Sequence, residues 1–287
     1  MTDTQTPEER RKLARRTVLA AGGVAVTAIG VGGAFTAGAE ASDQEGDACY
    51  TLTSELVEGP YYIDADKIRQ NVTEDQEGIP LALRLKVIDA ETCRPVRNAA
   101  VDIWHCNASG IYSGYEEMSS GGGGPAPTGA PPSGTPTDIP TGPPPGGGGG
   151  HQEPTDDKRY LRGTWRTDRQ GYVGFRTVFP GWYRGRCVHI HVKVHVDGTW
   201  TDAGYEGGHT CHTGQLFFDE RSVLASAEVE PYASNTTTRT TLDEDTIYPG
   251  NGHEGGLLHL RYDRRHVAHG VQAHLTLGIT PDATHDG

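Results

Sequence analysis

Hydrophobic and polar residues alternate along several short stretches of the chain. Leu81, Leu83, Leu85 and Val87 follow the period-2 pattern of a strand with one buried face, and Ala100–Trp104 follows a turn. Five more segments read as strands between Gly, Asn and Asp turns: GYVGFRTVFPGWY (171–183), VHIHVKVHV (188–196), TGQLFFD (213–219), GLLHLRYD (256–263) and GVQAHLTLGIT (270–280). No convincing long amphipathic helix interrupts them. The pattern predicts a mainly β fold, an antiparallel sandwich or barrel.

A low-complexity segment interrupts this pattern. Residues 116–156 contain GGGGPAPTGAPPSGTPTDIPTGPPPGGGGG, which cannot bury enough apolar area to fold and is predicted to be a disordered loop or linker. A boundary between two domains is the alternative. We favour an insertion into a single domain, 42–287, because the strand pattern resumes after the segment and the chemistry that follows connects with residues before it.

The N-terminus has the pattern of an export signal. Arg15 and Arg16 precede a charge-free, Gly- and Ala-rich run that reaches Ala39, and small residues suited to cleavage follow. Residues 1–41 are therefore predicted to be a Tat-type signal peptide, which makes the mature protein extracellular or attached to the cell surface. An uncleaved membrane anchor is the alternative, since the run is long enough to span a bilayer. After cleavage we expect no stable membrane association.

The net charge and the cysteines indicate which partners and which cellular compartment suit the protein. The 287 residues include 25 Lys and Arg against 38 Asp and Glu, a net charge of −13, so nucleic acid is not an expected partner. Export would expose five cysteines to an oxidising compartment, where disulfides form. We expect Cys49 to pair with Cys93 and Cys187 with Cys211, although the sequence leaves other pairings open.

The segment GWYRGRCVHIHVKVHV (181–196) carries candidate metal chemistry. In a strand, His189 and His191 point to the same face, and paired neutral imidazoles suit Zn, Cu, Fe or Ni. His-x-His alone is equally consistent with exposed or packing histidines. Tyr183 and Tyr112 strengthen the metal interpretation. The phenolate is a hard anion that suits Fe(III) better than zinc, so a site of two tyrosines and two histidines would be ferric.

Two segments together resemble a known family. DIWHCNASGIYSGY (102–115) and PGWYRGRCVHIHVKV (180–194) resemble the ligand motifs of intradiol ring-cleavage dioxygenases, most closely the exported members related to the protocatechuate and catechol dioxygenases. The resemblance runs from residue 58 to residue 219. It implies an antiparallel β-sandwich of the intradiol dioxygenase type with long loops. It also implies a non-haem Fe(III) cofactor bound by Tyr112, Tyr183, His189 and His191.

The resemblance further implies the reaction and its residues. Catechol-type rings would be cleaved with O2 between the two hydroxyl-bearing carbons, giving muconate-type dicarboxylates without a reductant. Tyr183 would be a ligand and then a base, Arg186 would stabilise negative charge on the bound ring, and Gln215 would hydrogen-bond in the pocket. A surface salt bridge is the alternative for Arg186, and a strand-edge amide for Gln215.

Six further residues near the motifs receive secondary assignments. Tyr61 is expected either to line the pocket wall or to pack in the core, and Trp104 is expected to pack in the core. We expect His105 to make a structural hydrogen bond and His195 to lie outside the ligand set. His209 and His212 are expected at the pocket rim or on the surface.

Two other functions remain open at this stage. One is an extracellular binding module on the same sandwich without turnover, and the other is an enzyme that uses a different metal at these residues. The presence of all four ligand residues argues against the binding module. The chain lacks the N-terminal helical region with which catechol dioxygenases dimerise, so no oligomeric state is predicted. The acidic composition slightly favours neutral catechols over carboxylated ones.

Overall fold

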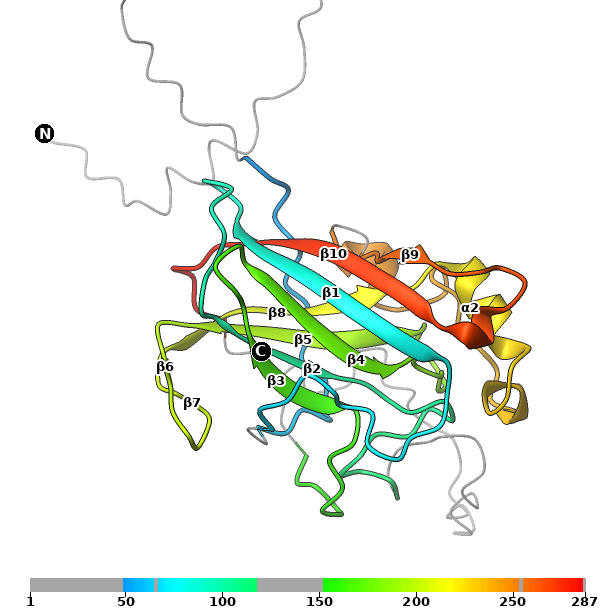
Figure 1. Ribbon diagram of the computed structural model, residues 1–287. Coiled ribbons are helices and arrows are strands. Elements are labelled where there is room, and N and C mark those ends of the chain that lie inside the picture. The colour runs from blue at the N-terminus through cyan, green and yellow to red at the C-terminus, as the bar shows by residue number, and fades with distance from the viewer. Residues whose placement is uncertain (1–48, 65–66, 118–151, 253–254, 286–287) are drawn as a thin grey trace, which may run out of the picture. The chain divides into compact units, whose positions relative to one another are not determined.

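The computed structural model describes residues 49–64, 67–117, 152–252 and 255–285 (Figure 1). The predicted signal peptide, 1–41, and residues 118–151 of the predicted insertion lie outside the described residues. Among the described helices, none is long and apolar enough to cross a membrane.

Two four-stranded sheets form the two layers of a sandwich (Figure 1). The first sheet has the order β4 (Tyr172–Val178), β1 (Pro80–Asp89), β10 (Val271–Ile279), β9 (His259–Arg261). The second has the order β3 (Arg162–Arg166), β2 (Ala100–Trp104), β5 (His189–Val196), β8 (His209–Phe217). Each neighbouring pair in these two sheets is antiparallel except β1 and β10, which run parallel. The predicted antiparallel sandwich is confirmed, with this one parallel pair added.

The remaining elements are short. The strands β6 (Thr199–Trp200) and β7 (Tyr205–Glu206) pair as a two-stranded hairpin. The helix α2 (Glu220–Ala227) begins at Asp219, whose side chain accepts a hydrogen bond from the Ser222 amide. Single turns η1 (Tyr232–Ser234), η2 (Tyr248–Gly252) and η3 (Val267–His269) complete the described structure.

Alternation along β1 builds the core, as predicted. Leu81, Leu83, Leu85 and Val87 are buried and pack in one cluster with inward residues of the second sheet, among them Ile190 on β5. The stretch at 162–166 was not predicted to be a strand, because Arg-Gly-Thr-Trp-Arg has no apolar alternation. It forms β3 through its pairing with β2, a tertiary contact that local pattern cannot show.

One predicted disulfide is confirmed and the other is wrong. Cys49 and Cys93 are bonded, whereas Cys187, Cys211 and Cys106 are buried free thiols. Cys187 lies two residues before β5, but the antiparallel register places Cys211 beside Val194 and His195 at the far end of that strand. Roughly 25 Å of strand therefore separates the two thiols, and a disulfide requires Cα atoms within about 7 Å.

Candidate metal centre

The second sheet places the two candidate histidines side by side on its outer face. Along β5, Ile190 and Val192 point inward and belong to the core, so His189 and His191 point outward. The register sets His191 between Trp104 on β2 and Gln215 on β8. Both imidazoles are nonetheless buried, which means that loops cover this face of the sheet.

Two loops bring the tyrosines over these histidines. Tyr112 follows β2 through a turn in which the Asn107 side chain accepts hydrogen bonds from the amides of Ser109 and Ile111. The turn has φ +83° at Gly110, where a Cβ atom would lie 2.3 Å from the Trp182 carbonyl oxygen. The loop that carries Tyr112 thus packs directly on the backbone of the loop that carries Tyr183, and only glycine fits between them.

Four polar atoms converge at this point. His189 Nε2 lies 3.1 Å from His191 Nε2, 3.3 Å from Tyr183 Oη and 3.5 Å from Tyr112 Oη. Atoms that bind one ion at about 2.0–2.1 Å lie roughly 3 Å from one another, so this spacing fits a shared metal ion. Among the described residues, no group of three or more His, Cys, Asp or Glu side chains is arranged to hold a metal ion. A metal centre here therefore requires the two phenols.

Neighbouring groups orient both imidazoles. His189 Nδ1 lies 2.7 Å from the Cys187 carbonyl oxygen, which can only accept, so Nδ1 carries the proton and the Nε2 lone pair faces the cluster. The His191 ring stacks on Trp104 with centroids 4.8 Å apart and an interplanar angle of 9°. Trp104 is buried as predicted, and it also holds a candidate ligand in place.

Burial favours the neutral form of all four candidate ligands. It raises the pKa of Tyr112 well above its usual value, and it raises the pKa of Tyr183 although Arg186 opposes the change. Burial together with Arg186 lowers the pKa of His189 to about 3, and burial with the neighbouring His189 lowers that of His191. The imidazoles thus present lone pairs, and the phenols would ionise only beside a strong cation.

A buried clamp holds Arg186 beside the tyrosines. Its Nε donates to Asp245 Oδ2 at 2.9 Å, and another guanidinium nitrogen donates to Gln215 Oε1 at 2.5 Å. Gln215 in turn donates to the Val57 carbonyl oxygen at 3.0 Å, so it faces the site from β8 and is not an exposed edge amide. The carboxylate of Asp245 is fully buried, which separates this pair from an ordinary surface salt bridge.

Asp245 is a site residue that sequence reasoning missed. Burial alone would raise its pKa, but Arg186 and the amides of Tyr248, Cys187 and Ile247 lower it to about 2. The carboxylate therefore joins Arg186 to the loop before η2. It lies 59 residues after Arg186 in the chain, and no local motif marks it.

A second missed residue, Arg162 on β3, holds the outer wall. Its guanidinium donates to the Ser113 carbonyl oxygen at 2.7 Å and to the Tyr61 carbonyl oxygen at 2.6 Å, and burial lowers its pKa to about 10. The Tyr61 ring packs on Tyr112 with centroids 4.9 Å apart. Tyr61 therefore lies against a candidate ligand and packs on the aromatic cluster around it.

The two ends of the predicted insertion meet next to the site. The Tyr115 hydroxyl donates to the Gln152 carbonyl oxygen at 2.7 Å, and the Thr155 amide donates to the Gly114 carbonyl oxygen at 2.7 Å. Asp156 also accepts from the Gly114 amide at 3.0 Å. The residues on the two sides of the undescribed segment thus contact each other at Gly114 and Tyr115, within three residues of Tyr112.

Four further histidines named in the sequence analysis bond outside the cluster. His105 is buried and bonded to the Cys106 carbonyl oxygen and to Thr177, as expected of a structural histidine. His195 bonds to Asp102 Oδ2 at 3.0 Å, outside the cluster. His209 is half-buried and bonds to the Pro281 carbonyl oxygen. The rim or surface assignment of His212 is wrong, because its side chain is fully buried against Glu55 at 2.6 Å.

Comparisons with known proteins agree with the fold. A family model described as dioxygenase matches residues 57–122, a range that contains Tyr112. Among curated proteins, no sequence matches the chain. A solved dioxygenase is 30% identical with a TM-score of 0.65, covering 83% of this chain and 98% of its own. An intradiol ring-cleavage dioxygenase from Tetranychus urticae is also 30% identical, with a TM-score of 0.64, over 82% of this chain and 98% of that one. Identity at this level, spread over nearly the whole length of that enzyme, shows that the chain belongs to the intradiol ring-cleavage dioxygenase family.

Proposed function

We propose that this dioxygenase holds non-haem Fe(III) through Tyr112, Tyr183, His189 and His191 and cleaves catechol-type rings between their two hydroxyl-bearing carbons. The observation that carries the proposal is the convergence of two phenol oxygens on His189 Nε2 beside a second imidazole, at 3.1 to 3.5 Å. Two hard anionic oxygens and two imidazole nitrogens form a donor set suited to a trivalent ion. When bound, ferric iron would activate the chelated ring toward O2.

The protein's own residues would handle protons and charge. Of the two phenols, Tyr112 is fully buried whereas Tyr183 is a partly exposed residue, which favours Tyr183 as the ligand nearer to an entering catechol. We assign it as the group that accepts a proton from a catechol hydroxyl. Arg186, fixed by Asp245 and Gln215, would stabilise negative charge that develops on the ring. Tyr61 would pack against the substrate side of Tyr112.

Visible absorption under air tests the metal assignment. Iron bound to phenolate has a charge-transfer band in the visible, and zinc has none. We expect a coloured protein whose band moves to longer wavelength when catechol is added. Tyr183→Phe and Tyr112→Phe should each lose intensity, whereas Tyr61→Phe, a matched change at a tyrosine outside the cluster, should keep the band. A protein that stays colourless after loading with ferric iron would contradict the ligand assignment.

Oxygen uptake distinguishes turnover from binding. An iron-loaded protein that shifts its band with catechol should also consume one O2 per ring and release a muconate-type dicarboxylate, detectable by mass spectrometry. A band shift without O2 uptake would favour an extracellular binding module. Turnover by a zinc-loaded, colourless protein would favour an enzyme that uses another metal.

We also propose that the enzyme is exported through a Tat-type signal at residues 1–41. Twin arginines before a charge-free run support this assignment, and so does the disulfide between Cys49 and Cys93, because such bonds persist in oxidising compartments. Changing Arg15 and Arg16 to Lys should trap the protein inside the cell. Unchanged export of that variant would contradict the proposal.

A further inference from the structure

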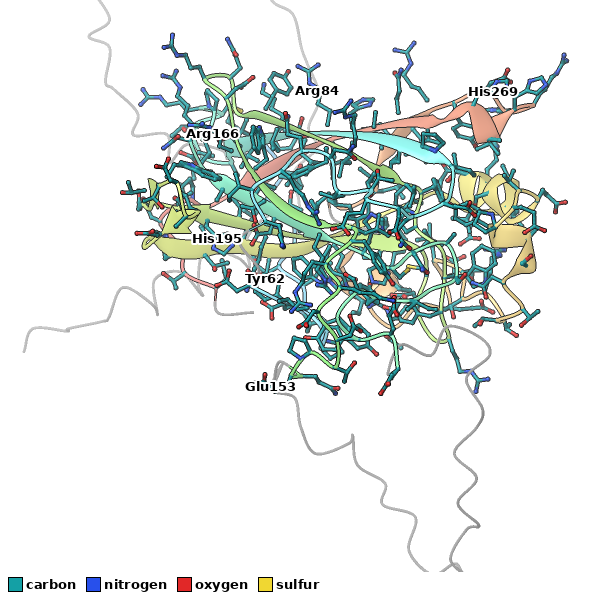
Figure 2. The ribbon with its side chains drawn as sticks, turned by 60° about the horizontal axis from the view of Figure 1, so that its bottom comes forward. Tyr62, Arg84, Glu153, Arg166, His195 and His269 are labelled. Carbon is teal, nitrogen blue, oxygen red and sulfur yellow. A yellow bond between two sulfur atoms is a disulfide. The ribbon has the colours of Figure 1, made fainter. Side chains whose placement is uncertain are left out.

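The first sheet of the sandwich presents a basic outer face, on the side away from the candidate metal centre. Outward positions on its four strands carry four cations, Arg84, Lys86, Arg176 and Arg261, together with the imidazoles of His259 and His274. No outward position on these strands is acidic, although the chain as a whole has a net charge of −13. Figure 2 shows Arg84, Arg166 and His269 on one side of the molecule and Tyr62 and Glu153 on the other.

The cations of this basic face have no carboxylate partners within the described part of the chain. Arg84 lies over the Tyr172 ring at 4.0 Å and Lys86 lies over the same ring at 5.7 Å. Among the described residues, five other Lys and Arg side chains pair with carboxylates, including Arg69 with Glu74, Arg186 with Asp245 and Arg239 with Glu220. A sheet face that gathers four cations and has no acidic outward position, in a chain with an excess of acid, points to an anionic ligand on that face.

The carboxylates at the edge of the face are already engaged. Glu74 is paired with Arg69 at 2.6 Å, Asp263 accepts from the Arg265 amide at 2.9 Å and contacts His266, and Asp168 accepts from the amides of Gln170 and Tyr172. Glu74 is thus matched by Arg69, whereas Asp263 and Asp168 keep their negative charge, so the four cations of the strands outnumber the two carboxylates at the edge that no Lys or Arg matches.

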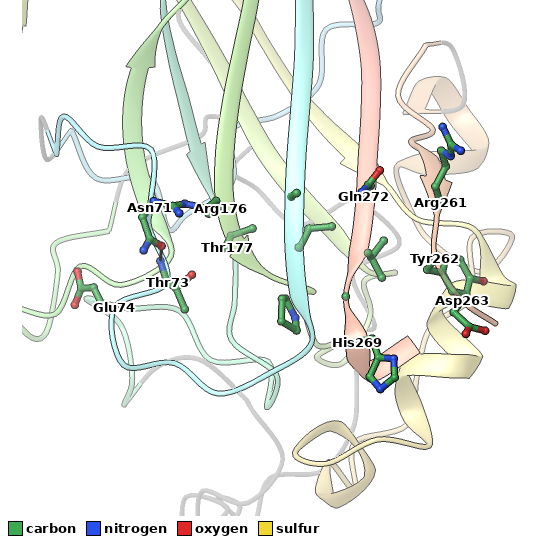
Figure 3. Close-up of a pocket in the computed structure, with 15 residues that line it drawn as sticks. Asn71, Thr73, Glu74, Arg176, Thr177, Arg261, Tyr262, Asp263, His269 and Gln272 are labelled. Atoms are coloured by element: carbon green, nitrogen blue, oxygen red, sulfur yellow. Dashed lines mark hydrogen bonds between the residues drawn. The ribbon is translucent and has the colours of Figure 1, made fainter. Parts of the chain in front are cut away.

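Two adjoining hollows run across the basic face. One, of about 860 Å³, lies between Arg176 on β4 and Arg261 on β9 (Figure 3), and the short Ala82 side chain is among the residues that line it. The register aligns Arg176, Ala82, Gln272 and Arg261 in one row, so the two arginines stand about 14 Å apart across three strand spacings.

The second hollow, of about 690 Å³, contains Arg84, Arg166 and Tyr172 and shares Ala82 and Arg176 with the first. A continuous track therefore crosses the sheet, which suits a linear polymer better than a single small molecule.

We propose that this track binds a carboxylate-bearing polysaccharide, a polyuronate, and so anchors the enzyme to a polymer while the metal centre faces the other way. Guanidinium groups bind carboxylates in a two-pronged fashion, and the amide and hydroxyl side chains of Asn71, Thr73 and Gln272 in the same hollow suit sugar hydroxyls. Because charges beyond about 10 Å are screened at 0.1 M salt, the local cations outweigh the distant acidic surface.

Other polyanions fit the face less well. Anionic membranes are bound by surfaces that also insert apolar side chains, and none of the large exposed apolar residues, Tyr50, Leu52, Val57, Ile68, Leu224 and Leu257, occupies an outward position on these strands. Duplex DNA carries one charge per about 1.7 Å of its axis. Four cations spread among amides, hydroxyls and the carboxylates of Glu74 and Asp263 match a polymer with sparser charge.

Binding to soluble polygalacturonate, measured by affinity electrophoresis and by titration calorimetry in 50 mM NaCl, tests the proposal. The purified protein should bind, and the double variant Arg84→Gln/Arg176→Gln should bind at least about tenfold more weakly, since each change removes a hydrogen bond to a charged group. The control Lys158→Gln/Arg184→Gln removes the same charge from two exposed positions outside the track and should bind like the unaltered protein. Circular dichroism and unfolding midpoints should be unchanged in both variants.

Three results would overturn the inference. The unaltered protein could fail to bind polygalacturonate, or the track variant could bind as tightly as the control. The third is tighter binding, at equal concentration of anionic charge, to duplex DNA or to phosphatidylserine vesicles, which would assign the face to nucleic acid or to membrane.

Discussion

Replacing Asp245 with Asn isolates the carboxylate that fixes Arg186. The side chain keeps its shape but loses its charge beside a buried guanidinium. In the folded protein the pKa of Asp245 falls from 3.8 to about 2. At 1.36 kcal/mol per pKa unit, the charged carboxylate stabilises the fold by about 2 kcal/mol at neutral pH. Because the folded pKa is the lower one, this contribution is complete well above pH 4, about half lost near pH 3, and absent below pH 2.

Urea denaturation of the Asp245→Asn variant at pH 7 measures this contribution. We expect the free energy of unfolding to fall by about 2 kcal/mol, and the gap from the unaltered protein to narrow as the pH drops toward 3. Asp243→Asn, an exposed neighbour, should change stability by less than about 0.5 kcal/mol. Because Arg186 would be less firmly held, kcat for catechol should fall about tenfold with little change in KM. A variant as stable and as active as the Asp243 control would refute the reasoning.

Three further changes have expected outcomes. Gly59→Ala places a Cβ atom at φ +81° and 3.2 Å from the His191 ring. It should lower the free energy of unfolding by about 1–2 kcal/mol and weaken the retention of iron against a chelator. Unaltered retention would argue against this contact. Lys193→Met removes the ammonium group from beside the buried Glu58 carboxylate and should lower the free energy of unfolding by about 3–5 kcal/mol. Adding Glu58→Leu should recover most of this loss, and denaturation of both variants measures the two effects. Reduction of the disulfide, whose cysteines are 44 residues apart, should cost roughly 4 kcal/mol, which an unchanged denaturation midpoint would contradict.

Local pattern predicted the parts of the fold in which one buried face dictates the residues. The alternation in β1 and the His-x-His spacing in β5 each follow from the two-residue period of a strand, and the structure bears both out. The strand β3 escaped prediction because its Arg162 points into the wall of the site and breaks the apolar pattern. Functional demand at that position overrode the local signal.

Contacts between distant parts of the chain could not be predicted. Asp245 reaches Arg186 only because the loop before η2 folds back beside β5. The sequence left the pairing of Cys187 with Cys211 open, and strand register, which no local pattern reveals, holds them at opposite ends of β5. Both outcomes depend on contacts between segments that are distant in the chain, and no local pattern in a single sequence reveals such contacts.

The parallel pairing of β1 with β10 bears on how the protein is made. These are the first and last strands of the described fold, joined in register from Leu81 with Val271 to Asp89 with Ile279. During synthesis, β1 must wait for almost the whole domain before its partner leaves the ribosome, and until then one edge of the strand lacks its neighbour. Such long-range pairing slows folding and exposes intermediates to aggregation. Loss of the final strand would therefore leave β1 with an open edge, and we expect chains truncated before residue 271 to aggregate during expression.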